Sequence, residues 1–325
     1  MKKIIFCLLA TILGFSVQGQ TVRHNVPLDS IILSDPAILA DETTDLYYMT
    51  GTGGKLWHSP DLKVWEGPYD VAQPDTTSWM GAHPAIWAAE LHKYKGKYYY
   101  FATFTNPDII IDHQNSEDIP RRASHVLVSD NPMGPYRPVG PDNYLPSDKP
   151  TLDGTFWVEP DGTPYMVYCW EWLQQLDGTI EAIQLRQDLS GAVGEAELLF
   201  HASDAPWNHD DARGVTSTGK QSEVTDGPFL FRTDTGRLGM IWTSWKGDIY
   251  CQGVAYSESG TIHGPWHQQE DLITPLNFGH GMLFQDFDGQ WRMSVHSHSD
   301  INGHYSRIPH IFPADLSTDT LKIEY

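Results

Sequence analysis

The chain has 325 residues, of which 40% are hydrophobic, 12% aromatic and 19% charged, so it can form one large folded domain and is not a disordered protein. Its 42 acidic residues outnumber the 21 Lys and Arg, and the formal net charge of −21 argues against binding DNA through its phosphates. The 28 Gly, 22 Pro and 12 Trp favour an all-β fold with many turns over a helix bundle.

The first residues have the pattern of an export signal. Two lysines precede an apolar run over residues 4–15, and small residues follow up to Gly19. The apolar run is too short to cross ~30 Å of hydrocarbon, so we interpret residues 1–19 as a signal peptide rather than a membrane helix. The predicted mature protein, residues 20–325, is expected to be secreted or periplasmic, without a membrane span.

The mature chain contains two cysteines, Cys169 and Cys251. They are too few for a disulfide framework or for a zinc site built from cysteines. The sequence leaves open whether they form one disulfide bond or stay reduced.

Short strand patterns recur along the mature chain inside five longer units. Each unit begins with a short apolar segment, turns at Gly or Asp, continues in an aromatic run and ends in a further strand. In chain order the aromatic runs are LYYMTGT, KYYYFATF, PYMVYCWEW, RLGMIWTSW and QWRMSVHSHS. Taking Asp35, Trp87, Asp153, Asp226 and His280 as corresponding openings gives spacings of 52, 66, 73 and 54 residues. We therefore predict a single-domain, all-β, five-bladed β-propeller rather than a sandwich.

Propeller geometry predicts which of these residues meet. The first strand of each blade lines the axis and the second returns beside it, so the start of the first and the end of the second reach the same mouth of the channel. From opening strands these residues are Asp35, Asp153, Asp226 and His280, and from returning strands they are Glu171, Trp172, Trp245, Ser297 and His298. We expect them to converge.

Three carboxylates at the starts of three blades suit the hydrolysis of a glycosidic bond. One activates water, one protonates the leaving oxygen, and the third adjusts the pKa of the second. We expect Trp87, Trp172 and Trp245 to offer faces on which sugar rings stack. His296 and His298 have a spacing that can chelate a metal, but we favour hydrogen bonds to substrate or backbone, and we take His298 as a substrate-binding residue.

Several motifs lie in a fixed order along the chain. They are SDPAIL, HPAIWAAEL with KGKYYYFAT, LDGTFWVEPDG, TDGPFLF and the blade endings MGPY and HGPW. In this order they resemble glycoside hydrolase family 43, whose members are five-bladed propellers that hydrolyse arabinans, xylans and related polysaccharides with inversion. By matching motif, Asp35 resembles the general base, and Asp153 resembles the aspartate that orients the acid and adjusts its pKa. His280 resembles an axial histidine that in several members contacts a calcium or other ion through water.

One position departs from the family pattern. The family's general acid is usually a Glu directly before Gly-Pro, whereas here the matching residue is Asp226, whose carboxyl is set back by roughly 1.5 Å. Three interpretations remain. Asp226 is still the acid and the substrate sits deeper; Glu171 has taken the role; or Glu223 has it, although Glu223 fits a solvated surface charge better.

The sequence thus predicts a secreted glycoside hydrolase that cleaves arabinofuranosyl or xylosyl linkages by single displacement. Asp35 is the expected base, Asp226 or Glu171 the acid, and the two carboxyls are expected ~6.5–9.5 Å apart. The alternative raised by Asp226 is a carbohydrate-binding propeller with impaired catalysis. We favour a pocket that takes terminal L-arabinose.

The expected partner is an oligo- or polysaccharide, not a nucleic acid, and the expected oligomeric state is a monomer. The reaction needs no cofactor, although one Ca²⁺ or other ion in the central channel is compatible with the resemblance, with His280 contacting it through water. The connections over residues 106–124 and 203–221 are expected to be loops at the rim of the site.

Overall fold

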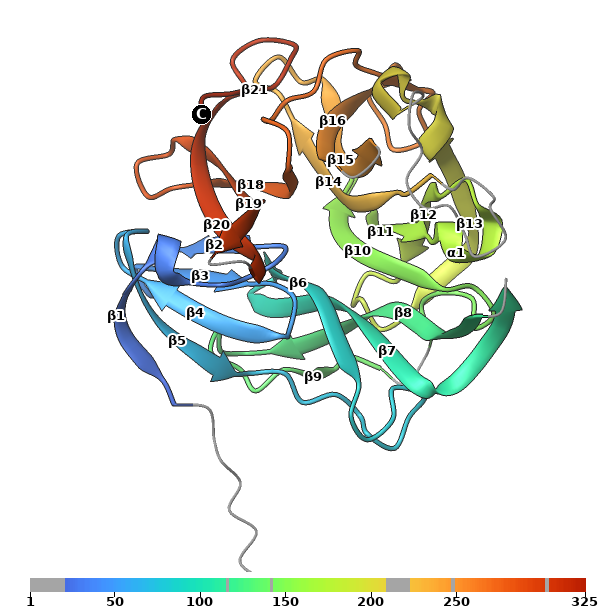
Figure 1. Ribbon diagram of the computed structural model, residues 1–325, viewed down its shortest axis with the longest axis horizontal. Helices are drawn as coiled ribbons and strands as arrows, with labels where there is room; N and C mark the ends of the chain where they lie inside the picture. Colours follow the sequence, from blue (N-terminus) through green and yellow to red (C-terminus); the bar gives the residue numbers. More distant parts are fainter. Residues whose placement is uncertain (1–20, 115–116, 141–142, 209–222, 247–248, 302–303) are drawn as a thin grey trace, which may run out of the picture.

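The computed structural model describes residues 21–114, 117–140, 143–208, 223–246, 249–301 and 304–325. Their strands form five sheets arranged in a ring around a central axis (Figure 1). This confirms the predicted five-bladed β-propeller. The predicted signal peptide, residues 1–19, lies outside the described residues. Within the described part of the chain, no helix combines the length and the apolar character needed to cross a membrane.

Each blade consists of strands that are consecutive in the chain and follow one another outward from the axis. The first blade contains β2 (Ala37–Asp41), β3 (Leu46–Thr50), β4 (Lys55–Ser59) and β5 (Val64–Asp70), with β1 (Arg23–Pro27) on its outer edge. The second contains β6 (Ala85–Tyr94), β7 (Lys97–Gln114), β8 (Glu117–Ser129) and β9 (Arg137–Pro138). The third contains β10 (Thr151–Val158), β11 (Pro164–Trp170), β12 (Thr179–Leu185) and β13 (Ala192–His201).

The last two blades follow the same plan. The fourth contains β14 (Asp226–Arg232), β15 (Leu238–Lys246), β16 (Ile249–Ser257) and β17 (Trp266–Gln268). The fifth contains β18 (Phe278–Gln285), β19 (Trp291–Ile301), β20 (His304–Asp315) and β21 (Lys322–Ile323). The described helices are short: η1 (Leu28–Ser30), α1 (Trp172–Gln175), η2 (Ala202–Asp204) and η3 (Pro206–Asn208).

The hydrophobic core lies between the blades. Strand β15 is buried at every position except Lys246, because neighbouring sheets cover both of its faces. Trp242 from this strand packs against Phe200 and Trp207. Fully burying a large apolar side chain contributes ~1.5–3 kcal/mol, so these contacts between sheets are a main source of stability. The aromatic runs that identified the repeat are therefore the residues that hold neighbouring blades together.

The innermost strands share a backbone irregularity close to one mouth of the channel. The register of β6, β10, β14 and β18 with the next strand shifts there. One residue at each of these places has a positive φ, and Asp35 before β2 is equivalent: Asp35 59°, Ala88 43°, Asp153 55°, Gly227 47° and His280 55°.

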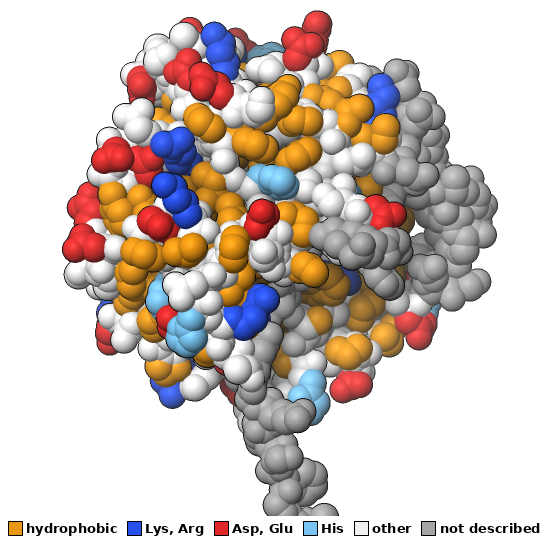
Figure 2. All heavy atoms as spheres, turned by 60° about the vertical axis from the view of Figure 1, so that its left-hand side comes forward, with side chains coloured by type: hydrophobic (Ala, Val, Ile, Leu, Met, Phe, Trp, Pro, Cys, Tyr) orange, Lys and Arg blue, Asp and Glu red, His pale blue; other side chains and the backbone are white. Residues whose placement is uncertain are grey.

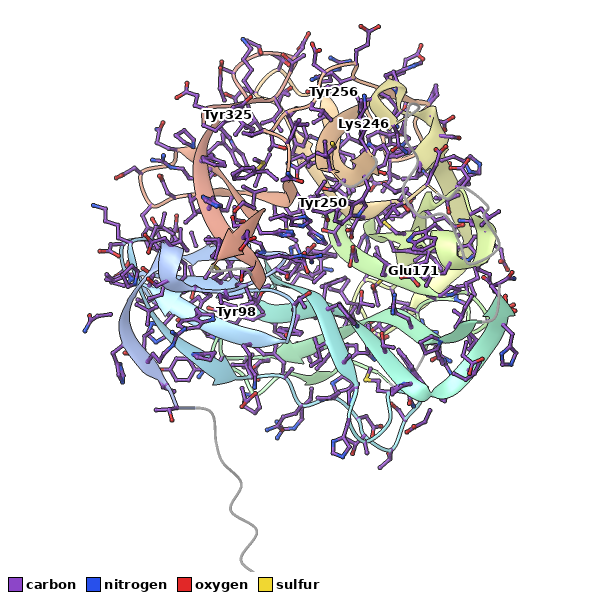
Figure 3. All side chains as sticks on the ribbon, viewed as in Figure 1. Tyr98, Glu171, Lys246, Tyr250, Tyr256 and Tyr325 are labelled. Carbon is purple, nitrogen blue, oxygen red and sulfur yellow. The ribbon has the colours of Figure 1, made fainter. Side chains whose placement is uncertain are left out.

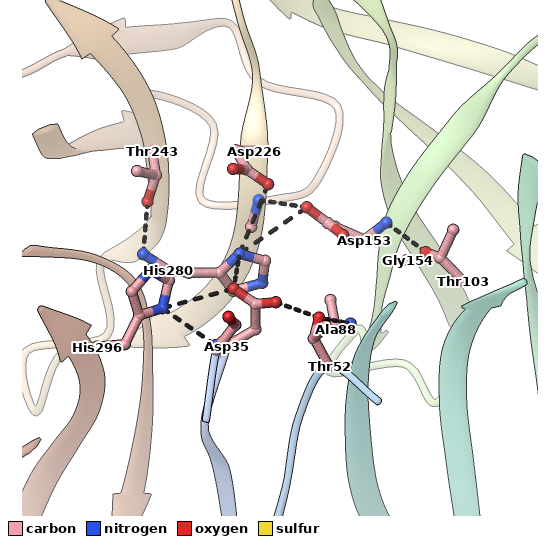
Figure 4. Close-up of polar contacts among 12 residues, drawn as sticks. Asp35, Thr52, Ala88, Thr103, Asp153, Gly154, Asp226, Thr243, His280 and His296 are labelled. Carbon is pink, nitrogen blue, oxygen red and sulfur yellow. Dashed lines mark hydrogen bonds and ion pairs between the residues drawn. The ribbon is translucent and has the colours of Figure 1, made fainter. Parts of the chain in front are cut away.

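The amide of each of these residues donates a hydrogen bond to a side chain of the preceding blade. The acceptors are His296 for Asp35 (3.0 Å), Thr52 for Ala88 (2.9 Å), Thr103 for Asp153 (2.8 Å), Asp153 for Gly227 (3.0 Å) and Thr243 for His280 (2.9 Å). These five bonds, which we call the blade latches, run once around the ring (Figure 4). The latch from His296 to Asp35 joins the fifth blade to the first.

The latches show that the predicted openings were not all equivalent. Asp35, Asp153 and His280 occupy the position of positive φ, whereas Trp87 and Asp226 precede it by one residue. Successive side chains on a strand point to opposite faces. Asp226 therefore differs from Asp153 in its surroundings, and its side chain is 24% exposed compared with 6% for Asp153.

The described residues of the connection predicted as a rim loop over residues 106–124 are instead regular structure. Residues 106–114 belong to β7 and residues 117–124 to β8, and the two paired strands extend past the rest of the blade (Figure 1). A hydrogen bond of 3.0 Å from Gln174 of α1 to Asp112 ties the hairpin to the third blade. Most of the second predicted rim loop lies outside the part of the chain that is described.

Candidate active site

Three carboxylates from three blades surround one imidazole ring at the mouth where the latches lie. The Nδ1 atom of His280 is 3.2 Å from Oδ1 of Asp35, 3.5 Å from Oδ1 of Asp226 and 3.9 Å from Oδ2 of Asp153. Figure 4 shows the four side chains pointing toward one another. The structure thus brings together the four residues that were expected to converge from the opening strands.

The charge of His280 follows from its position. Burial alone would lower the pKa of this histidine, but the neighbouring carboxylates of Asp35, Asp153 and Asp226 outweigh burial and raise the pKa to about 10. The ring is therefore an imidazolium at neutral pH. Gly227 lies against the ring, and a Cβ at that position would approach the ring atoms to 2.7 Å. A glycine there lets the backbone pass close to the histidine.

The surroundings of Asp35 fix its carboxylate in place. The hydroxyl of Thr52 donates to Oδ2, and Nδ1 of His296 lies 3.5 Å from Oδ1. Since Nδ1 of His296 accepts the amide proton of Asp35, the proton of the neutral ring is on Nε2. That atom is 3.2 Å from Nε2 of His298, so it donates there. Burial, together with the positive charge of Arg307, lowers the pKa of His296 well below its ordinary value.

Asp153 and Asp226 form a close pair with opposite pKa shifts. Burial and the negative charge of Asp226 raise the pKa of Asp153 well above its ordinary value. Burial also disfavours the charged form of Asp226, but hydrogen bonds with Asp153 and His280 outweigh it and lower the pKa. The hydroxyl of Tyr250 donates to Oδ2 of Asp226 at 2.6 Å. The two opposite shifts mean that Asp153 holds a proton more readily than Asp226 does.

A cavity of about 410 Å³ opens beside this cluster. Its volume is in the range of small-ligand sites. The residues that line it are Leu152, Glu171, Trp172, Val224, Thr225, Asp226, Trp245 and Arg307. Four of them, Glu171, Trp172, Asp226 and Trp245, were predicted site residues. Arg307 was missed because the prediction considered only the first two strands of each blade, whereas Arg307 lies on the third, opposite His298.

The other two predicted substrate-binding residues, Trp87 and His298, do not line this cavity. The ring of His298 stacks on Tyr250 with centroids 4.6 Å apart and also contacts Trp245. Trp87 is 42% exposed on the second blade, and the guanidinium of Arg122 lies 5.5 Å from the centre of its ring. Of the four predicted substrate-binding residues, Trp172 and Trp245 therefore line the cavity, and Trp87 and His298 do not.

Several other titratable side chains do not line this cavity. Glu90 and His92 are hydrogen-bonded to each other at 2.7 Å and line a separate cavity of about 570 Å³ at the other ends of the innermost strands. Glu223 accepts a hydrogen bond from Asn208 at 3.4 Å. Cys169 and Cys251 are both buried and free, so they form no disulfide bond.

The side chains around His280 do not suit a directly bound calcium ion. Ca²⁺ takes six to eight oxygen ligands, whereas Asp153, Asp226 and His280 offer two carboxylates and a nitrogen within 4.8 Å of one another. A protonated imidazole has no lone pair for a cation. The Nε2 atom of His280 is buried and has no hydrogen-bond partner among the described residues, which leaves it free to bond a water. Contact with an ion through such a water stays a prediction.

Comparisons with known proteins identify the family and the fold. The family model described as glycosyl hydrolases family 43 matches residues 25–319. No curated protein matches the chain. An endo-arabinase from Bacteroides thetaiotaomicron VPI-5482 is 33% identical, with 90% of this chain and 97% of that chain covered and a TM-score of 0.76.

Two further solved structures share the fold at lower identity. An endo-1,4-beta-xylanase from Bacteroides thetaiotaomicron is 22% identical, with 94% and 97% of the two chains covered and a TM-score of 0.69. An exo-1,5-alpha-L-arabinanase from a bovine ruminal metagenomic library is 18% identical, with 90% and 97% covered and a TM-score of 0.63.

Proposed function

The chain belongs to family 43 of the glycosyl hydrolases, and we propose that it hydrolyses arabinofuranosyl linkages of plant polysaccharides by single displacement with inversion. The observation that carries the proposal is the cluster of three carboxylates around His280 beside a cavity of ligand size. The arabinofuranosyl substrate is proposed because the endo-arabinase is 33% identical to this chain, whereas the xylanase is 22% identical.

Asp35 is the residue we propose as general base. The hydroxyl of Thr52 donates to its carboxylate and orients it. The hydrogen bond from its amide to His296 fixes its backbone. In the proposed step Asp35 takes a proton from water while the water oxygen attacks the anomeric carbon. The imidazolium of His280, 3.2 Å from Oδ1, holds this carboxylate toward the cluster.

The leaving sugar oxygen must receive a proton from the other side of the scissile bond. Asp226 and Glu171 both line the cavity, and each is a candidate for this general acid. Asp153 is proposed to adjust the protonation of Asp226, because each carboxyl group shifts the pKa of the other. Trp172 and Trp245 are proposed to contact the sugar, since they form walls of the same cavity.

The test is hydrolysis of arabinan, arabinoxylan, xylan and galactan, with product analysis and proton NMR during the first minutes. We expect arabinose or arabino-oligosaccharides whose anomeric configuration is the inverse of the substrate's. The length distribution of these products reports whether chain ends or interior bonds are cut. Net retention would refute single displacement, and release of xylose alone would refute the proposed substrate.

Export of the protein is part of the same proposal, because an enzyme must leave the cytoplasm to reach polymeric arabinan. Residues 1–19 would direct this export and be removed. Amino-terminal sequencing of the protein recovered from outside the cytoplasm should then begin at residue 20. An intact terminus on that protein would contradict the assignment.

A further inference from the structure

We infer that Glu171, held in place by Arg122, is the residue that protonates the leaving oxygen. The inference rests on the proposed function and decides between the two acids that it leaves open. It assigns Arg122, which the sequence did not single out, as a positioning residue. Four features of the structure support it.

The first feature is the unequal surroundings of the two oxygens of Glu171. The side chain is 4% exposed, and Oε1 accepts a hydrogen bond from Nη1 of Arg122. The other oxygen, Oε2, is buried and has no hydrogen-bond partner among the described residues. Leaving a buried polar atom without a partner costs ~1–3 kcal/mol, and more for a charged group. A substrate oxygen in the adjoining cavity would supply the missing partner.

The second feature is the position of Glu171 in the cavity. It follows β11 directly and lies at the start of α1, where its amide donates to the carbonyl of Pro150 and its own carbonyl accepts the amide of Gln174. The backbone is thus fixed on both sides. Figure 3 shows Glu171 on the third blade, on the far side of the channel from the first blade, which carries Asp35. An acid and a base on opposite sides of the sugar suit single displacement.

The third feature is the short distance between the other candidate acid and the base. Oδ1 of Asp35 and Oδ1 of Asp226 are 3.2 and 3.5 Å from the same nitrogen of His280, so these two oxygens can be no more than 6.7 Å apart. Inverting enzymes keep the two carboxyls ~6.5–9.5 Å apart to leave room for water and sugar. Oδ1 of Asp226, the oxygen that faces His280, therefore reaches that range only at its lower limit.

The fourth feature is the network that holds Arg122. Its Nε donates to the hydroxyl of Thr105 at 2.9 Å, and the indole nitrogen of Trp87 donates to the same hydroxyl at 3.1 Å. With one guanidinium nitrogen on Thr105 and another on Glu171, the arginine fixes the orientation of the Glu171 carboxyl group. Trp87 is therefore coupled to the acid through Arg122.

Electrostatics agree with a protonated Glu171. Burial raises the pKa of this carboxyl, Arg122 partly opposes the rise, and the negative charge of Asp226 adds to it. Asp226 itself has a lowered pKa, because its hydrogen bonds with Asp153 and His280 outweigh the effect of burial. A general acid must carry its proton in the free enzyme, which favours Glu171.

In the proposed step the oxygen of water forms a bond to the anomeric carbon as the bond from that carbon to the leaving oxygen breaks. The electron pair of the broken bond goes to the leaving oxygen, which takes the proton from Oε2 of Glu171. The proton lost by water goes to Asp35. Proton exchange with solvent then returns both carboxyl groups to their starting states.

The experiment compares Glu171→Gln with Asp226→Asn on arabinan and on 4-nitrophenyl α-L-arabinofuranoside, whose leaving group needs little protonation. For Glu171→Gln we expect kcat/KM on arabinan to fall ~10²–10⁴-fold, as for other general acids, and on the aryl substrate less than tenfold. Asp226→Asn should lower kcat/KM on both substrates by a similar factor. Thermal unfolding of each variant shows whether it is folded.

Equal losses on both substrates for Glu171→Gln would overturn the inference, as would selective loss on arabinan for Asp226→Asn. If Glu171→Gln does not fold, Arg122→Met supplies the test. Removing the positive charge raises the pKa of Glu171, so the basic limb of the pH profile of kcat/KM should move to higher pH, and an unmoved limb would reject Glu171. Wild-type enzyme without activity on either substrate would instead refute the proposed function itself.

Discussion

Asp35→Asn separates the chemistry of the proposed base from its structural surroundings. Asp35 has a φ of 59°, a left-handed conformation that Asn adopts more readily than other residues with a side chain. Asn also keeps an oxygen that can accept the hydroxyl proton of Thr52, and the latch to His296 uses only the backbone amide of residue 35, not its side chain. The substitution therefore removes the ability to take a proton while changing little else.

The size of the effect follows from these contacts. Losing a general base lowers turnover by ~10²–10⁴-fold. A factor of ten corresponds to 1.36 kcal/mol, so this range is about 3–5 kcal/mol of transition-state stabilisation. Breaking a buried ion pair so that one charge is left alone costs ~3–5 kcal/mol of stability, but His280 keeps the carboxylate of Asp226 at 3.5 Å. The expected loss of stability is therefore smaller than that range.

The assay is the initial rate of reducing-sugar release from arabinan at saturating substrate, with urea unfolding measured on the same samples. Asp161→Asn, in an exposed turn between β10 and β11, is the matched control and should keep wild-type activity. If Asp35→Asn retains more than a tenth of wild-type turnover, Asp35 is not the base. A loss of activity explained by unfolding would show instead that its carboxylate is structural.

Two further predictions concern packing and pH. Gly227→Ala should be destabilised more than Gly162→Ala in thermal unfolding: both glycines have positive φ, but only at Gly227 would a Cβ meet a ring, that of His280, at 2.7 Å. Equal changes in melting temperature would show that the ring can move aside. Burial lowers the pKa of His125 to about 4, so acidification from pH 7 to pH 4 should remove up to ~3 kcal/mol of unfolding free energy, as its ordinary pKa is ~6.5. His125→Phe should lack this part of the acid sensitivity, and an unchanged slope in urea unfolding at several pH values would count against the assignment.

The fold was predictable because its signal is repeated. An aromatic run such as that around Trp242 must be buried on both faces, and five such runs at similar spacing leave few architectures other than a ring of sheets. The clustering of Asp35, Asp153 and His280 followed from the same repeat. Each occupies one place in its blade, and the blade geometry then determines where the side chain goes.

The rest of the site depends on features that the repeat does not encode. The one-residue offset of Asp226 depends on which residue adopts positive φ, and here Gly227 rather than Asp226 does so. Arg122 and Arg307 come from third strands, where the sequence pattern reads as ordinary surface strand. Their relation to the cavity depends on contacts between blades, such as Arg122 with Glu171, for which the chain order gives no signal.

The latch from His296 to Asp35 has a consequence for how the enzyme is made. The amide of Leu33 donates to the carbonyl of Arg307 at 3.0 Å, and the hydroxyl of Ser294 donates to the carbonyl of Pro36 at 2.6 Å. The proposed base therefore lies where the first and the fifth blade meet. A chain that ends before the fifth blade lacks the histidine that binds the amide of Asp35. We therefore expect such truncated products to be inactive rather than partly active.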